Sequence, residues 1–329
     1  MADITHDVTR DTPSATRAGL RLWPIFILVG LALYAMLYLW SENLVQEHGE
    51  RNRFFMVSTT PPSTINTVIL GASHAMPLGY GDFNDRLEAA SGGSVMNLSI
   101  EGGGILPAQL MLDYFFKRHA ARQVVFFIDS FAFYSSQWNE DRPDSAMFAR
   151  APLDLDLATT LLSYPWARQE LLPYLSGFTK INNAERFAVD RSDAELTKFS
   201  QTYRPIPQID RQRVAYLFPP EISQAEFQRY LGEFEGLAAM VAEQGATLIL
   251  VKPPTPDRYR GALPDELAFD AAITAMVDRL GLTYRDFSTL LPGDENYYDT
   301  DHLNAMGVEN FIATGFADLL RQQNATLVR

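Results

Sequence analysis

The chain has 329 residues, 47% of them apolar, which is enough for one large hydrophobic core or two smaller ones. Its net charge of −13 makes nucleic acid an unfavourable partner, so we expect no nucleic-acid binding. Cysteine is absent, which excludes thiol catalysis, disulfides and cysteine-ligated zinc. The histidines form no cluster with metal-ligand spacing, so the sequence predicts neither a metal nor a cofactor.

The segment 22–40, "LWPIFILVGLALYAMLYLW", contains no charged residue. At 1.5 Å per residue it spans a hydrocarbon core of about 30 Å, with tryptophan near both ends. We therefore predict a transmembrane anchor over 22–41. Arginines precede it at positions 10, 17 and 21 and follow it at positions 51 and 53.

This small excess of arginine before the segment favours a cytoplasmic tail, 1–21. The rest of the chain is then expected outside the cytoplasm, as a periplasmic domain held by a single pass through the inner membrane. The alternative is a cleaved signal peptide, although no small-x-small cleavage site follows Trp40.

After a predicted stalk, 42–62, strand and helix patterns alternate. Strands are expected at 67–70, 94–98, 123–128, 247–251 and 282–285, and helices at 81–90, 107–119, 223–244, 264–280 and 305–322. Runs such as "VVFFI" and "TLILV" are apolar without alternation, as in strands covered on both faces. We predict an α/β domain with a parallel sheet over 63–325, carrying an insertion at about 131–222.

In an open parallel sheet, ligands bind beyond the carboxyl ends of the strands. Four stretches of polar or small residues fall there in this chain, and they are Gly71–His74, Asn97–Gly104, Asp129–Ser130 and the loop 297–311. The residues of these stretches are the candidates for chemistry.

Ser73 is predicted as the nucleophile, and a serine hydroxyl needs a base. His302 can act as that base if Asp299, three residues earlier, accepts from one imidazole nitrogen. Asp301 is the rival carboxylate, but a residue adjacent to the histidine is poorly placed for this bond. His74 adjoins Ser73 and is a poor base for it, so we interpret it as a structural or pocket-lining residue.

When a serine attacks an acyl carbonyl, the oxyanion that forms must be stabilised by hydrogen-bond donors such as backbone N–H groups. Gly102 to Gly104 allow the backbone to approach a reacting group closely, and the N–H of Ser73 begins a predicted helix. Both are predicted contributors to an oxyanion hole.

The blocks "VILGASH", "NLSIEGGG" and "DTDHLNAMGVENF" resemble those of the SGNH (GDSL-like) hydrolase superfamily. The resemblance covers about 63–325 and implies a flavodoxin-like parallel-sheet sandwich. Ser73 matches the nucleophile, Gly102 the oxyanion glycine, and Asp299 and His302 the Asp-x-x-His pair.

The third block of that family offers Gly-x-Asn-Asp, where this chain has Asp129-Ser130-Phe131-Ala132. The oxyanion asparagine is therefore missing, and Asn97 or a residue of the insertion is the candidate replacement.

The anchored arrangement is similar to the alginate O-acetyltransferase proteins and to the D-alanyl transfer protein of the lipoteichoic acid system. The resemblance implies a serine O-acyltransferase or esterase that acts on a cell-surface polysaccharide or similar polymer through an acyl-serine. It also implies a multi-spanning membrane-bound O-acyltransferase as a partner. The alternative is a degenerate domain that binds polymer or a membrane partner without chemistry.

Overall fold

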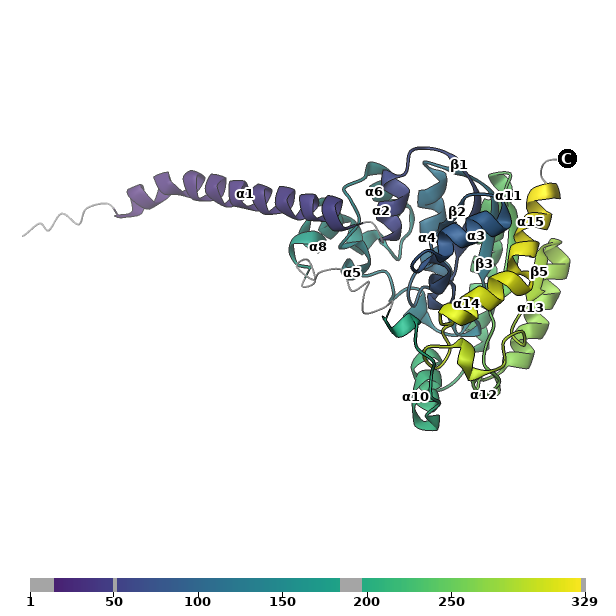
Figure 1. Ribbon diagram of the computed structural model, residues 1–329. Coiled ribbons are helices and arrows are strands. Elements are labelled where there is room, and N and C mark those ends of the chain that lie inside the picture. The colour runs from purple at the N-terminus through teal and green to yellow at the C-terminus, as the bar shows by residue number, and fades with distance from the viewer. Residues whose placement is uncertain (1–14, 50–51, 184–196, 327–329) are drawn as a thin grey trace, which may run out of the picture.

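The structure, a computed structural model, describes residues 15–49, 52–183 and 197–326. Residues 1–14 of the predicted tail and 184–196 of the predicted insertion therefore lie outside the described residues. The body of the molecule is an α/β domain, from which the long helix α1 projects to one side (Figure 1).

The predicted α/β class with a parallel sheet is confirmed. Five parallel strands pair in the order β2-β1-β3-β4-β5, which is the flavodoxin-like order. The strands are β1 Thr64–Leu70, β2 Val95–Asn97, β3 Ala120–Phe127, β4 Thr247–Lys252 and β5 Thr283–Asp286. Each overlaps its predicted range.

Alternate residues of the central strands face two hydrophobic cores. Leu248 and Leu250 of β4 pack into one core, which also contains residues of α4, α11 and α13. Ile249 and Val251 pack into the other core, with residues of α3, α14 and α15. The sheet is therefore covered on both faces, as its uninterrupted apolar runs predict.

The helices of the body begin and end at recognisable signals. Ser223 caps α11 by accepting from the N–H of Glu226, and Gly281 ends α13 in the left-handed conformation. The helices are α1 Ala15–His48, α2 Arg53–Thr59, α3 Phe83–Ser91, α4 Ile105–Phe116, α5 Ser145–Phe148, α6 Leu155–Ser163, α7 Leu171–Leu175, α8 Phe178–Ile181, α10 Pro207–Leu217, α11 Gln224–Glu243, α12 Asp257–Arg260, α13 Glu266–Leu280, α14 Ala305–Phe311 and α15 Ala317–Thr326.

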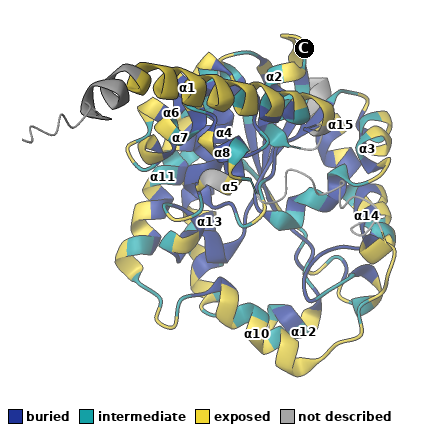
Figure 2. Cartoon of the chain, turned by 90° about the vertical axis from the view of Figure 1, so that its left-hand side faces the viewer, coloured by how far each residue is buried: buried dark blue, intermediate teal, exposed yellow. Residues whose placement is uncertain are grey.

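The segment 42–62 is mostly helical and packs onto the domain. Helix α1 extends into this segment and ends at His48, and the side chain of Val45 near its end is buried. Helix α2 follows, with Phe54 and Val57 buried in the first core. Figure 2 shows the exposed length of α1 and the buried strands behind it.

Helix α1 contains the predicted anchor. Its Leu22–Glu47 portion is long and apolar enough to cross a membrane, which is consistent with a single-pass anchor or a signal sequence. The apolar side chains of this portion up to Trp40 are largely exposed to solvent rather than packed in the domain.

Candidate active site

Ser73 lies at the carboxyl end of β1. The strand ends at Leu70, and Gly71 follows with φ +137°, a conformation that L side chains rarely adopt. A Cβ at Gly71 would also lie 2.8 Å from the carbonyl oxygen of Phe127. The glycine thus allows β1 and β3 to stay close while the chain turns, and Ser73 then begins the short 3₁₀ helix Ser73–Gly79.

His302 lies on a loop that is folded by the carboxylate of Asp299. Oδ1 of Asp299 accepts from the backbone N–H groups of Asp301 at 3.1 Å and of His302 at 2.8 Å. Asn304 then caps α14 by accepting from the N–H of Gly307 at 2.8 Å. A three-residue spacing therefore places the carboxylate beside the imidazole that follows it.

The structure brings Ser73, His302 and Asp299 together in a chain of hydrogen bonds. Nε2 of His302 lies 2.8 Å from Oγ of Ser73, and Nδ1 of His302 lies 2.9 Å from both carboxylate oxygens of Asp299. A base between a hydroxyl and a carboxylate is the arrangement that activates a serine nucleophile.

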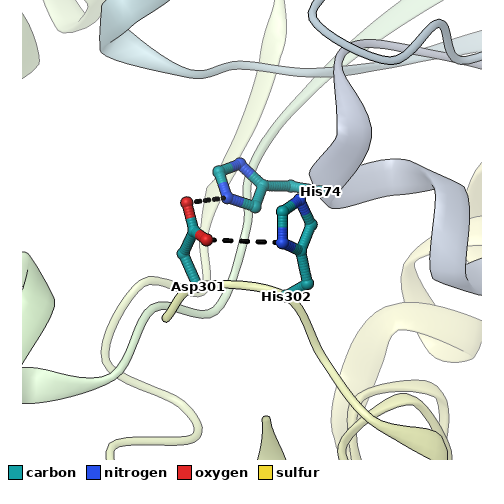
Figure 3. A group of neighbouring side chains, drawn as sticks. All are labelled: His74, Asp301 and His302. Carbon is teal, nitrogen blue, oxygen red and sulfur yellow. Dashed lines mark ion pairs between the residues drawn. The ribbon is translucent and has the colours of Figure 1, made fainter. Parts of the chain in front are cut away.

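A second carboxylate, Asp301, also faces the imidazole. Its Oδ1 lies 3.3 Å from Nδ1 of His302, and its Oδ2 lies 3.1 Å from Nε2 of His74 (Figure 3). The same Oδ2 lies 2.9 Å from Nε of Arg213. The side chain of Asp301 is only 1% exposed, and that of Asp299 is 40% exposed. Asp301 is thus paired with cations inside the protein, and Asp299 faces the cavity.

The pKa values of these carboxylates follow from their partners. Burial raises the pKa of Asp301, but His302, His74 and Arg213 outweigh it and hold that pKa well below the usual value. Burial likewise raises the pKa of Asp299, and the charge and hydrogen bonds of His302 lower it to below the usual value. Both carboxylates are therefore ionised at neutral pH.

His74 points away from the serine beside it. Its Nδ1 lies 2.7 Å from Oδ1 of Asp129, and its Nε2 faces Asp301. Burial lowers the pKa of His74, but the two carboxylates outweigh burial and raise that pKa to about 10. His74 is therefore an imidazolium between two carboxylates, with no nitrogen free to act as a base for Ser73.

The three glycines of the glycine-rich turn differ in their hydrogen bonds. Gly103 donates to the carbonyl of Ile100 and Gly104 to that of Trp138. Gly102 lines the cavity with φ +60°, and among the described residues its N–H has no acceptor assigned. A Cβ there would lie 2.9 Å from the ring of Trp138, so this position also requires glycine.

The structure does not bring Asn97 to the cavity. Asn97 is 2% exposed, its Nδ2 donates to the carbonyl of Ala75 at 2.8 Å, and its Oδ1 accepts from the N–H and hydroxyl of Ser99. The amide holds the end of β2 against the 3₁₀ helix that begins at Ser73.

The residues after β3 also point elsewhere. Asp129 pairs with His74, and Oγ of Ser130 donates to Glu266 at 2.7 Å. Phe131, at the position where the third block has asparagine, lines the cavity with an apolar ring, so residues 129–132 offer no side-chain amide there.

A cavity of about 900 Å³ opens over Ser73, His302 and Asp299. Aromatic side chains line it together with groups of both charges. The aromatic residues are Tyr80, Phe131, Trp138, Tyr216 and Tyr298, and the charged ones are Glu101, Asp141, Arg142, Asp144, Lys198, Arg213 and Asp299. Several of these come from the predicted insertion, which therefore builds one wall of the site.

One group of side chains has the composition of a metal site. Ligand atoms of His74, Asp301 and His302 lie within 4.8 Å of one another. However, both nitrogens of His74 face carboxylates, Asp301 is paired with Arg213, and Nε2 of His302 faces Ser73. These contacts fit ion pairing and serine activation, and they do not fit a cation.

Sequence reasoning did not find Arg213 or the partner of Asp129. Arg213 is remote in the sequence, on α10 of the insertion, and no motif marks it. The partner of Asp129 could have been predicted from sequence. A buried carboxylate at the end of a strand needs a cation, and His74, in the turn after the neighbouring strand, can provide one.

No protein-family model matches this sequence, and no curated protein matches it. Among solved structures, it is similar to a "putative acylhydrolase" from Bacteroides fragilis, at 9% identity and a TM-score of 0.43. That match covers 83% of this chain and 94% of the other. The likeness is distant, so activity must be argued from the site itself.

Proposed function

We propose that this chain is a membrane-anchored serine O-acyltransferase or esterase of the SGNH type. The observation that carries the proposal is the bond of 2.8 Å between Nε2 of His302 and Oγ of Ser73, with Asp299 on the other nitrogen. This is the geometry that a serine needs to become a nucleophile.

The reaction follows from these atoms. His302 takes the hydroxyl proton as Oγ of Ser73 attacks the acyl carbonyl, and Asp299 stabilises the imidazolium that forms. The N–H groups of Ser73 and Gly102 are proposed to bind the oxyanion. His302 then gives the proton to the leaving oxygen, which leaves an acyl-serine. An acceptor hydroxyl, deprotonated by His302, then attacks the acyl carbonyl. The bond between the acyl carbon and Oγ breaks, and His302 returns the proton to Oγ of Ser73.

A cell-surface polysaccharide or similar polymer is the proposed acceptor. The cavity exceeds the needs of one small acyl group, and its aromatic rings offer flat apolar faces beside polar edges. Sugar rings present the same combination of C–H faces and hydroxyl edges. Water as the acceptor makes the same site an esterase.

The proposed location is the inner membrane, with the domain on the periplasmic side. The exposed apolar length of α1 supports an anchor, and the arginines before it support a cytoplasmic N-terminus. A multi-spanning membrane-bound O-acyltransferase is the proposed supplier of the acyl group.

A fluorophosphonate tests the proposal because it labels only an activated serine. We expect the full-length protein to be labelled and the Ser73→Ala variant to stay unlabelled. Ser130→Ala is the matched control, because Ser130 also follows a strand but donates to Glu266, and it should be labelled like the parent.

If the parent protein is folded but does not react with the fluorophosphonate, the proposal of catalysis is contradicted. It would favour the alternative of a binding domain without chemistry, for which the missing asparagine after β3 is the supporting observation.

A further inference from the structure

An uncharged apolar surface lies beside α1 on helices α7 and α8. The segment 171–178, "LLPYLSGF", contains no charged residue. Within it Leu172 is 74% exposed, Leu175 39% and Phe178 50%. The nearest charged neighbours on each side are hidden, since Glu170 is 9% exposed and Lys180 1%.

This surface is fixed to the anchor helix by specific contacts. Oη of Tyr34 donates to the carbonyl of Ser176 at 2.9 Å. The ammonium of Lys180 pairs with Glu42, which also accepts from the backbone N–H of Leu153 at 2.8 Å. Helix α8 and the turn before it thus lie against the end of α1 (Figure 1).

Gly177 makes the approach of the two segments possible. It has φ +75°, and a Cβ there would lie 2.3 Å from the ring of Tyr38. The backbone of the α7–α8 turn therefore lies directly against the aromatic side chain of the anchor, with no room for a larger residue.

The height of these contacts sets the depth of the surface. Tyr34 precedes Trp40 by six residues, which corresponds to about 9 Å along a helix. If the span 22–40 fills the hydrocarbon core, Ser176 lies deeper in the bilayer than Trp40, which marks the edge of that core. Leu175 and Phe178 flank Ser176 and Gly177 in the sequence, so they lie close to this depth, within the hydrocarbon core.

We infer that helices α7 and α8 insert into the leaflet on the domain side of the membrane, so that the domain is held by a second attachment beside α1. The occupant of this apolar surface is the lipid bilayer itself, because the surface is continuous with the anchor and carries no charge. The inference rests on the anchor that the proposed function includes.

The absence of cysteine allows a direct test, since single cysteines can be introduced and labelled one at a time. Leu172→Cys and Phe178→Cys report on the surface, and Leu33→Cys reports on the anchor. Leu267→Cys is the control, because Leu267 is 88% exposed on α13, which lies on the opposite side of the body from α1 (Figure 1). Each full-length variant carries an NBD fluorophore and is reconstituted without other proteins into vesicles of phosphatidylcholine and phosphatidylglycerol.

We expect the labels at positions 33, 172 and 178 to emit at shorter wavelength and to lose intensity when the vesicles contain spin-labelled acyl chains. The label at 267 should emit as in water and be quenched by iodide. Exposed positions are replaced throughout, so folding should survive, and circular dichroism checks it.

If position 33 is quenched by lipid, the anchor stands, and either of two results would then overturn the second attachment. One is that positions 172 and 178 behave like 267. The other is that they are blue-shifted but insensitive to spin-labelled lipid, because they are then covered by protein. Loss of quenching at position 33 would overturn the anchor as well. None of these results bears on Ser73, which the fluorophosphonate tests separately.

Discussion

The bond between Ser73 and His302 makes these two residues a unit. In the proposed mechanism, Ser73→Ala removes the nucleophile and His302→Ala removes its base. Each should therefore reduce the rate of serine acylation by about 10⁶-fold. The double variant should be no slower than either single variant, because the losses are not additive. Acylation of the full-length protein by an activated ester, with circular dichroism as a folding control, measures this. If the rate losses of the two single variants multiply in the double variant, Ser73 and His302 act independently and do not form a unit.

Asp299 and Asp301 both face His302, but their surroundings assign them different tasks. Asp299→Asn should reduce the acylation rate by about 10⁴-fold, because the imidazole loses its anionic partner. The loss of stability should be small, because the amide oxygen of asparagine can still accept from the N–H groups of Asp301 and His302. Asp301→Asn should instead destabilise the fold by about 3 kcal/mol, because Arg213 and His74 lose a buried anion.

Rates and thermal unfolding of both variants test this assignment. It fails if Asp301→Asn is the slower enzyme and unfolds like the parent.

The charge of His74 predicts a pH dependence of stability. Its pKa is about 10 in the folded protein and about 6.5 in an unfolded chain, so folding favours the protonated form. This contribution is complete below about pH 6.5 and is lost as the pH rises through 10. The difference in unfolding free energy between the parent and His74→Gln should therefore shrink from pH 7 to pH 10.

Chemical unfolding of both proteins across that range measures the difference. A constant difference would mean that His74 is not charged in the fold. His74 thus stabilises the fold through its two carboxylate partners, which are distant in the sequence.

Among the elements, α2 shows how a short helix can belong to a core. Phe54 contacts Tyr114 and Phe148, and Asn52 caps the helix by accepting from the N–H of Phe55. A soluble fragment that begins at residue 55 loses Phe54 and the cap, whereas one that begins at 49 keeps both.

Removal of the Phe54 side chain alone should cost about 3–5 kcal/mol, so the shorter fragment should unfold at a clearly lower temperature. Calorimetry of the two fragments measures the difference. Equal midpoints would mean that α2 does not contribute to the core.

The elements that could be predicted from sequence are those with a local signal. Strands β3 and β4 are marked by apolar runs, and α13 by its glycine at 281. The sequence pattern predicts one continuous helix over 305–322, but the structure divides it at Ile312–Phe316, where Gly315 has φ +143°. Helix α2 and the contact of Arg213 with Asp301 depend on distant partners, and no local pattern marks them.

At the scale of the whole molecule, the anchor hypothesis predicts a fixed topology. Protease added to spheroplasts should degrade the domain and leave the N-terminal tail protected, because the arginines before the span favour the cytoplasm. Protection is read with a tag at each end of the chain. A protected domain would reverse the topology and remove a cell-surface polymer from reach.

The contacts between the end of α1 and the domain make bilayer thickness relevant to the proposed function. The helix continues without interruption from Ala15 to His48, and Glu42 and Val45 near its end are held by the domain. A helix longer than the hydrocarbon core tilts in a thinner bilayer to hide its apolar surface. If α1 anchors the chain as proposed, its contacts at Glu42 and Val45 would carry such a tilt into the domain. Hydrophobic mismatch would then change the angle between the cavity over Ser73 and the membrane surface.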